Sequence, residues 1–435
     1  MSKKTIVLTG ITTTGTPHLG NYVGAIRPAI EASRNPDVSS FYFLADFHAL
    51  IKCDEPARVY RSRQEIAATW LAMGLDPQVA TFYRQSDIPE ITELTWILTC
   101  LTAKGLMNRA HAYKASVDAN QAAGNPDLDD GITMGLFSYP VLMAADILMF
   151  NANQVPVGKD QVQHIEMARD IAGRFNHTYA PLFTLPEAVV GEEGAVLSGL
   201  DGRKMSKSYN NTIPLFVEPD ELRKLIYQIK TDSRMPGEPK ATEGSSLFEI
   251  YSAFADRQQR DAMAARFAAG DGWGELKEQL FEFLDAQLTA PRAEYKRLMA
   301  DQGYLEQILR HGAEKARAYA TPLMDEVRRA VGLNSFTAGQ VQDDRPQGKK
   351  ADKELTADEQ AKLDAGKARA QEIARQREAE ARQQAEAELQ QLLKARSGDL
   401  TALAAELLDQ HETASKKDKK ALRLKLDIVE EWQQA

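Results

Sequence analysis

The feature that most constrains the fold is a short apolar run near the start of the chain, followed directly by small residues and a helix start. Thr5 to Thr9 read Thr-Ile-Val-Leu-Thr, and Gly10 closes the run. An apolar, β-branched run of this length is typical of a buried strand in a parallel sheet. The loop to Pro17 follows, and we expect a helix to begin at His18. Strand, small-residue loop and helix in this order predict the opening of a nucleotide-binding α/β unit.

The same alternation of strand and helix continues along the chain. We expect strands at Phe41 to Leu44 and at Phe82 to Arg84, with a helical stretch around Ile66 to Met73 between them. Strands that alternate with helices predict a Rossmann-like, doubly wound parallel sheet. The segment Leu94 to Ala122 is helical and semi-polar. We therefore expect a helical insertion between two halves of the sheet, over about residues 94–130.

The periodicity of apolar residues becomes purely helical from Val217 onward, and a polar stretch with Gly and Pro follows Leu333. A capping box at Thr356 then predicts one long, mostly solvated helix to Arg396. The expected parts are an α/β domain over residues 1–216, an all-helical domain over 217–333, a linker over 334–353 and a charged helical C-terminal extension over 354–435.

Composition limits the classes of function. Lys and Arg total 53 against 62 Asp and Glu, so the net charge is -9 and any RNA contact must use local patches. No segment approaches the roughly 20 apolar residues of a membrane span, and the start is too short for a signal-peptide core, so we expect a cytoplasmic protein. Cys53 and Cys100 are too few and too far apart for a zinc or iron–sulfur site, so neither is expected.

The first chemical motif lies at the strand-to-helix junction and reads Thr-Pro-His-Leu-Gly-Asn from Thr16 to Asn21. Free N–H groups and the positive end of a helix attract phosphate there. Gly15 and Gly20 allow a ligand to approach the backbone closely, and His18 can donate a hydrogen bond to a phosphate oxygen. Alone this signal is weak, because a His after a Pro at a helix start is more often a cap than a catalyst.

The second motif lies far downstream and reads Lys-Met-Ser-Lys-Ser from Lys204 to Ser208, on a loop that also contains Gly199 and Gly202. Closure of such a loop over a triphosphate would bring Lys204 and Lys207 to the departing pyrophosphate. A random Lys-x-x-Lys would more simply be a solvated basic turn.

Together the two motifs, in this order and at this separation, resemble the paired signatures of class I aminoacyl-tRNA synthetases. Between them, Met134 to Leu148 is similar to the amino-acid-binding helix of tryptophanyl-tRNA synthetases. Val155 to His164 resembles the ribose-binding stretch of the same family. The resemblance covers about residues 5–333.

The resemblance implies the residues of the site. It implies that Asp146 accepts a hydrogen bond from the indole N–H of tryptophan and that Met143 packs on the indole ring. A single buried acceptor among apolar side chains would reject Phe, because the Phe ring has no donor for it. It makes His18, Lys204 and Lys207 catalytic. The positions that it assigns to ATP are Thr12, Thr13, Thr14, Gly20, Asn21, Gly158, Lys159, Asp160, Val196, Lys204, Met205, Ser206, Lys207 and Ser208.

Two positions depart from the family pattern. The family usually has Gln-Pro-Thr or Gln-Pro-Ser where this chain has three threonines, Thr12 to Thr14, so a side-chain amide is missing. Lys159 replaces a common Glu, although Gly158 and Asp160 beside it still match. The role of Lys159 is therefore left open.

The implied reaction joins tryptophan to ATP as tryptophanyl-adenylate with release of pyrophosphate, and then transfers tryptophan to the 3′ end of tRNA(Trp). Mg²⁺ would travel with ATP as part of the substrate, and no resident metal site is needed. The resemblance further implies a homodimer. The basic cluster Lys416 to Lys420 could touch the tRNA backbone, or the extension could be a solubilising appendage.

Three alternatives stay open at this point. A tyrosine-specific enzyme of the same subclass would have Gln-Ala-Tyr-Asp in place of Met143-Ala-Ala-Asp146. A small-molecule adenylyltransferase would lack the long helical domain. A synthetase-like RNA-binding protein would have lost catalysis, against which the intact His18 and both lysines count.

Overall fold

The computed structural model describes residues 4–190, 197–336, 375, 379, 381–394, 399–413 and 418–434. The contacts divide the chain into two compact units, residues 1–347 and residues 348–435. Each unit has its own architecture and its own core.

The first unit is built on a five-stranded sheet with the strand order β3-β2-β1-β4-β5. The strands are β1 (Thr5–Thr12), β2 (Val38–Ala45), β3 (Thr81–Arg84), β4 (Gln154–Val157) and β5 (Glu187–Val190). All four pairings are parallel. The chain builds outward from β1 first through β2 to β3 and later through β4 to β5, so the order reverses at β1. This confirms the predicted doubly wound sheet and its first three strands, and ligands of such sheets bind where the order reverses.

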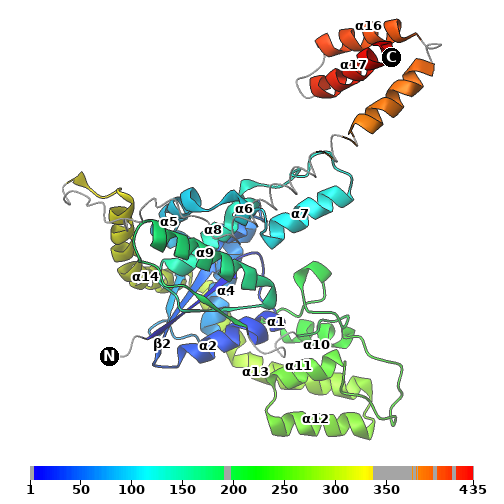
Figure 1. Ribbon diagram of the computed structural model, residues 1–435. Helices are drawn as coiled ribbons and strands as arrows, with labels where there is room; N and C mark the ends of the chain where they lie inside the picture. The colour runs from blue at the N-terminus through cyan, green and yellow to red at the C-terminus, as the bar shows by residue number, and fades with distance from the viewer. Residues whose placement is uncertain are drawn as a thin grey trace, which may run out of the picture. The chain divides into compact units, whose positions relative to one another are not determined.

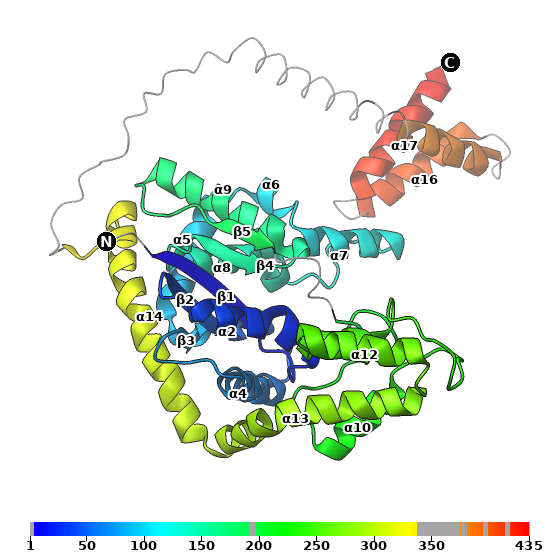
Figure 2. The ribbon, with the colours of Figure 1, turned by 90° about the horizontal axis from the view of Figure 1, so that it is seen from below.

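Helices cover both faces of the sheet, as Figure 2 shows from below. Side chains of β2 alternate between the faces: Phe41 and Phe43 join one core cluster, and Tyr42 and Leu44 join another. The first cluster packs on α5 (Pro89–Leu101), α8 (Met134–Leu148) and α9 (Val162–Thr178), and the second on α2 (Arg27–Ser33) and α4 (Pro56–Ala72). Each such buried side chain contributes about 1.5–3 kcal/mol. A strand buried on both faces explains why the sequence reads as a continuous apolar run.

Short elements connect this framework. They are α1 (Leu19–Asn21), the π-helix η1 (Tyr22–Ile26), α3 (Asp46–Ala49), η2 (Gln85–Asp87), α6 (Lys104–Met107), α7 (His111–Ala122), η3 (Lys159–Gln161) and η5 (Lys207–Tyr209). The segment between β3 and β4 is helical, as the sequence predicted, and α7 buries none of its side chains. The exact limits of the predicted insertion stay a prediction.

Within the described residues of the first unit, five α-helices follow the sheet, and Figure 1 labels them. They are α10 (Pro219–Gln228), α11 (Ser246–Phe254), α12 (Arg257–Ala269), α13 (Trp273–Ala300) and α14 (Gln302–Val331). Helices α10 to α13 share a core with Leu19 and Met205, which belong to the two motifs. Helix α14 returns along β3, and Gly312 permits this because a Cβ there would lie 1.7 Å from the carbonyl oxygen of Phe82. The division at residues 216 and 217 stays a prediction, since both sides lie in one unit.

The second unit contains a helix over 381–394, α16 (Leu400–Thr413) and α17 (Asp418–Gln434). Its core joins Ala385 and Leu389 to Leu403, Leu407 and Val429. The sequence predicted one long solvated helix to Arg396, whereas Ala385 and Leu389 are buried because their spacing puts them on one face that α16 and α17 cover. The predicted linker beyond residue 336, the capping box at Thr356, and the side chains of Lys416, Lys417 and Lys420 lie outside the described residues.

None of the helices in the described ranges is both long and apolar enough to cross a membrane.

Candidate active site

The short helix α1 begins at His18, which is its N-cap. His18 Nδ1 accepts a hydrogen bond from the backbone N–H of Asn21 at 3.3 Å, and Asn21 Oδ1 accepts one from the N–H of His18 at 3.2 Å. Since Nδ1 is the acceptor, the neutral ring carries its proton on Nε2, for which the described residues supply no partner. Burial, helped by the charge of Lys207, lowers the pKa of His18 to about 4. One neutral ring can therefore cap the helix through Nδ1 and donate to a phosphate through Nε2–H.

Helix α4 holds the loop that precedes His18. The Gly15 N–H donates to Ser62 Oγ at 2.8 Å, and Thr16 Oγ1 donates to Glu65 Oε2 at 2.6 Å. Ser62 and Glu65 are both buried. The sequence analysis missed this pair, because no motif marks a Ser and a Glu three residues apart on a helix.

The three threonines at the end of β1 have different surroundings. Thr12 is exposed and Thr14 is half-buried, so both can meet a ligand at this edge of the sheet. Thr13 is fully buried, and its hydroxyl finds no hydrogen-bond partner among the described residues. A direct contact between the Thr13 side chain and ATP would need a rearrangement of the loop.

The lysine loop lies against the first motif. The Nζ of Lys207 is 3.0 Å from the point where a Cβ on Gly15 would stand, and Cβ of Met205 is 3.5 Å from the matching point on Gly20. Much of the side chain of Lys207 is exposed. Burial near its ammonium group nevertheless lowers its pKa, while the negative charge of Glu65 acts to raise it. Lys204 is exposed on the same loop. The structure thus brings His18 and Lys207 together from opposite ends of the domain's sequence.

Backbone hydrogen bonds hold the two motif segments side by side. The N–H of Leu19 donates to the carbonyl of Ile213 at 3.0 Å, and the N–H of Leu215 donates to the carbonyl of Pro17 at 3.0 Å. Met205 is buried in the same core as Leu19. The arrangement is fixed by packing as well as by polar contacts.

Asn211 holds the base of the lysine loop and is buried. Its Oδ1 accepts from the N–H of Ser206 at 2.8 Å, and its Nδ2 donates to Asp201 Oδ1 at 2.7 Å and to the Lys204 carbonyl at 3.1 Å. The hydrogen bond from Asn211 is the main cause that lowers the pKa of Asp201 to about 2. Ser208 closes the motif with its hydroxyl 2.8 Å from that of Ser206. Sequence reasoning missed Asn211 because it lies outside the five-residue motif.

A buried carboxylate lies near the ends of β2 and β3. Asp146 of α8 is 1% exposed, with its Oδ2 2.8 Å from His48 Nε2 and its Oδ1 2.8 Å from Gln85 Nε2. Burial raises the pKa of Asp146, against the hydrogen bonds of His48 and Gln85. These are the partners that a buried acid requires. Met143 is half-buried one turn earlier on α8, on the side of the helix that carries Asp146.

Further polar side chains continue from this carboxylate. The ring of His48 meets the ring of Tyr139 edge-on with centroids 6.3 Å apart. The Tyr139 hydroxyl is 2.8 Å from His164 Nε2, and His164 Nδ1 is 2.9 Å from Gln161 Oε1. The sequence analysis did not single out these residues, although Tyr139 lies within the α8 stretch on which the resemblance rested.

The stretch after β4 lies at the same edge of the sheet, since β4 runs parallel to β1. Gly158, Lys159 and Asp160 are exposed, and a Cβ on Gly158 would lie 2.7 Å from Asp160 Oδ1. A side chain at Gly158 would therefore displace the carboxylate. Val196, expected beside adenine, lies outside the described residues.

Comparison with known proteins identifies the family. Residues 1–289 match the tRNA synthetases class I (W and Y). The chain is 63% identical over 349 residues to a tryptophan–tRNA ligase of Bordetella parapertussis, covering 80% of this chain and 77% of that one. A tryptophan–tRNA ligase of Pseudomonas aeruginosa is 64% identical over 335 residues, covering 76% and 75%. The crystal structure of a Campylobacter jejuni tryptophanyl-tRNA synthetase complexed with ADP and tryptophan has a TM-score of 0.69 and 41% identity, covering 75% of this chain and all (100%) of that one. The chain therefore belongs to the class I aminoacyl-tRNA synthetases of the tryptophan and tyrosine group, on the branch of the tryptophan–tRNA ligases.

Proposed function

We propose that the edge of the sheet where β1, β2, β3 and β4 end is the site at which this chain activates tryptophan with ATP and charges tRNA(Trp). The observation that carries the proposal is the meeting of His18 with Lys207, at the same sheet edge as the buried Asp146. A helix start and a cation suit a triphosphate, and a buried acceptor suits an indole N–H. The relative from Campylobacter jejuni, crystallised with ADP and tryptophan, supports an adenine nucleotide and tryptophan as the ligands.

In the first step the tryptophan carboxylate attacks the α-phosphorus of ATP in line, and the bond to the β-phosphate oxygen breaks. The pyrophosphate leaves with both electrons of that bond, so negative charge builds on it. Lys204 and Lys207 would neutralise this charge, and the Nε2–H of His18 would donate to a phosphate oxygen. Positioning and charge neutralisation suffice, so we assign no protein nucleophile. In the second step a terminal ribose hydroxyl of tRNA displaces AMP.

The assignments to ATP follow the matched positions. Thr12, Thr14 and the backbone of Gly20 are accessible at the sheet edge, and the segment from Gly158 to Asp160 is exposed beside them. Asn21 is committed to the cap of α1, so its contribution is to shape the helix start. Lys159 adds a positive charge next to the expected ribose, and its role there stays a prediction.

Recognition of tryptophan is assigned to Asp146 and Met143. Asp146 already accepts hydrogen bonds from His48 and Gln85, and a carboxylate has capacity for a further donor. Those two partners would orient the acceptor before the substrate arrives. Half-buried Met143 offers a soft apolar contact to an aromatic ring. An analogue without a donor would leave the acceptor unmatched, which supports tryptophan over phenylalanine.

The remaining partners are also proposals. Mg²⁺ would enter with ATP as part of that substrate; in the described ranges no three His, Cys, Asp or Glu side chains gather as a metal site. The resemblance to the family supports a homodimer, for which the segment around Leu94 to Ala122 is the proposed interface. A cytoplasmic location stays a prediction from the sequence.

The test is ATP–pyrophosphate exchange with each amino acid in turn, for which we expect only tryptophan to drive exchange. Lys204→Ala and Lys207→Ala should each lower the exchange rate by about 10² or more, since each removes charge stabilisation of the transition state. Tryptophan binding, followed by fluorescence, should change far less. Lys224→Ala, which removes an exposed lysine of α10, is the matched control.

Exchange driven by tyrosine would assign the site to a tyrosine-specific enzyme of the same subclass. No exchange with any amino acid would favour an RNA-binding protein without catalysis. Unchanged exchange in both variants of the loop would remove Lys204 and Lys207 from the mechanism.

A further inference from the structure

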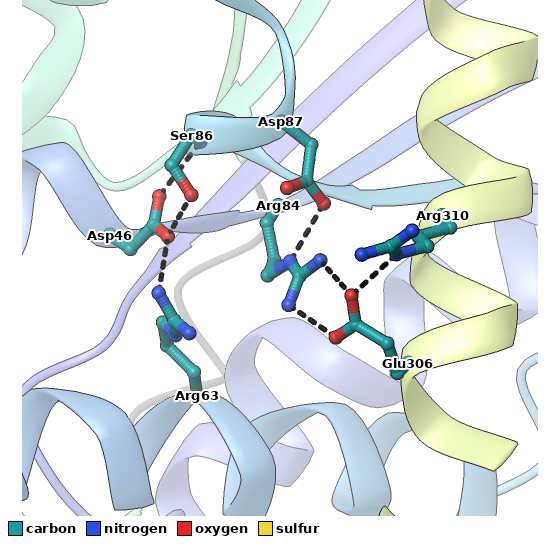
Figure 3. A network of polar contacts seen from close by, with 7 residues as sticks. All are labelled: Asp46, Arg63, Arg84, Ser86, Asp87, Glu306 and Arg310. Atoms are coloured by element: carbon teal, nitrogen blue, oxygen red, sulfur yellow. Dashed lines mark hydrogen bonds and ion pairs between the residues drawn. The ribbon is translucent and has the colours of Figure 1, made fainter. Parts of the chain in front are cut away.

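Three consecutive residues at the end of β3, Arg84 to Ser86, each hold a different part of the first unit, and Figure 3 shows the contacts of Arg84 and Ser86. Arg84 binds Glu306 of α14, Gln85 binds the buried carboxylate of α8, and Ser86 binds Asp46, the first residue of α3. The chemistry proposed above uses only that carboxylate. The segment therefore carries contacts whose purpose the reaction does not explain.

The side-chain amide of Gln85 is fixed in one orientation by its hydrogen bonds. It is fully buried, its Oε1 accepts from the N–H of Phe47 at 3.0 Å, and its Nε2 donates to both oxygens of Asp146 at 2.8 and 3.0 Å. The backbone donor and the carboxylate acceptor can both be satisfied in only one orientation of the amide. The position of the Gln85 backbone therefore sets where the Asp146 carboxylate is held.

Arg84 fixes that backbone to α14. Its two terminal nitrogens donate to Glu306 at 2.6 and 2.9 Å, and its Nε donates to Asp87 at 2.7 Å. Arg310 adds a further hydrogen bond to Glu306 at 2.8 Å. The hydrogen bonds of Arg84 and then of Arg310 lower the pKa of Glu306 to about 2. A bidentate pair between a planar guanidinium and a carboxylate fixes direction as well as distance.

Because of the position of Glu306 on α14, the pair of Arg84 and Glu306 links the helical region to β3. Helix α13 ends at Ala300 and α14 begins at Gln302, so Glu306 lies in the second turn after the joint between them. Further along, Gly312 lies directly against Phe82 and Arg317 pairs with Glu90, which hold the rest of α14 to the sheet. A shift of the helices before the joint would therefore reach the end of β3 through Glu306, in addition to the core that Leu298 and Leu305 share with Phe82.

We propose that Arg84 is a positioning residue for tryptophan: its pair with Glu306 sets the end of β3, and Gln85 passes this position on to Asp146. The inference rests on the proposed role of Asp146 as the acceptor of the indole N–H. It makes the start of α14 a place from which the helical region influences the amino-acid site. Small displacements of such an acceptor are costly because the reaction depends on alignment.

The ATP side has a separate anchor. Ser86 donates to Asp46 through its N–H at 3.0 Å and its hydroxyl at 2.6 Å, and Asp46 lies 3.3 Å from Arg63 of α4. Arg63 follows Ser62, which holds the Gly15 loop. These contacts do not involve Glu306, so the effect of losing Glu306 is selective for tryptophan.

The test is Glu306→Gln, which keeps the size of the side chain and removes its charge. In ATP–pyrophosphate exchange the KM for tryptophan should rise between about 2-fold and 30-fold, with little change in kcat or in the KM for ATP. The matched control is Glu314→Gln on the same helix, whose carboxylate is 77% exposed beside His311. Its constants should match those of the unaltered chain.

A double-variant cycle with Gln85→Ala separates positioning from stability. If Glu306 acts through Gln85, Glu306→Gln should add nothing to the KM for tryptophan once Gln85 is gone, whereas losses in melting temperature should still add. Two results would overturn the inference: an unchanged KM for tryptophan in Glu306→Gln, or an equal rise of this KM with and without Gln85. If the unaltered chain shows normal exchange in the same experiment, the proposed function still stands. No tryptophan-dependent exchange by the unaltered chain would reject both.

Discussion

His18 contributes to the site with both ring nitrogens. Nδ1 accepts the N–H of Asn21 and so completes the start of α1, which leaves the proton on Nε2. Burial keeps the ring neutral, and the nearby charge of Lys207 acts in the same direction. A neutral donor beside a lysine is suited to a phosphate, because the lysine supplies charge and the imidazole supplies direction.

The neutrality of His18 can be measured directly. Its ordinary pKa is 6.5 and its folded pKa is about 4, so between these values the unfolded chain binds the extra proton. The contribution of His18 to stability is therefore complete above pH 6.5, falls as the pH drops and is lost near pH 4. We expect its ring resonance in an NMR titration to move with a midpoint near 4, and Lys207→Ala to raise this midpoint. A His18→Asn variant assigns the signal, and a midpoint near 6.5 would contradict the structure.

Single polar residues mark what sequence reasoning could not reach. The motif of Lys204 to Ser208 is contiguous, so its chemistry is visible in the sequence. Asn211, which holds that loop, and Gln85, which holds Asp146, each act through hydrogen bonds across the fold. A lone Asn or Gln has the same local signature whether it is exposed or structural. Such contacts become visible only when the fold brings distant segments together.

The elements themselves were more predictable. Strand β2 is buried on both faces, as are Val7 and Leu8 of β1, and such continuous apolar runs are a local signal that needs no partner to be recognised. Helix caps and the Gly-bounded lysine loop are local as well. The packing of residues 381–394 was missed because few large apolar residues occur in that Ala-rich stretch. Its core depends on leucines that α16 and α17 bring to it.

The conformation of the lysine loop depends on the hydrogen bonds of Asn211. Asn211→Ala would remove four hydrogen bonds and leave the N–H of Ser206 without its acceptor, at a cost of about 1–3 kcal/mol. We expect the KM for ATP in the exchange reaction to rise while the KM for tryptophan stays constant, because Asn211 has no contact with Asp146 or its partners. Steady-state exchange with each substrate varied in turn is the measurement.

The control for this loop is Asn35→Ala, which changes an exposed asparagine whose side-chain oxygen accepts from the N–H of Asp37 at 3.0 Å. It should leave both Michaelis constants unaltered. A rise in the KM for tryptophan equal to that for ATP in Asn211→Ala would mean that the substitution disturbs the domain as a whole.

At the scale of the whole molecule, the first unit joins its helical region to its active site through one core. Leu19 of the first motif and Met205 of the second pack among residues of α10 to α13, such as Leu222 and Leu280. The helices after residue 217 therefore support the same two segments that are proposed to hold ATP. We expect them to unfold together with the sheet, since both belong to one compact unit and the helices share a core with Leu19 and Met205.

The second unit has a core of its own, in which Leu389, Leu403 and Val429 are buried within residues 348–435. Deleting these residues should leave tryptophan-dependent exchange and the melting temperature of the first unit unchanged, because none of the proposed site residues belongs to the deleted part. Calorimetry and exchange on the full and shortened chains are the measurements, and aminoacylation of tRNA(Trp) on both would show whether the basic residues of the extension aid tRNA binding. An insoluble or inactive shortened chain would mean that the first unit needs the extension to fold, and the division into two independent units would be wrong.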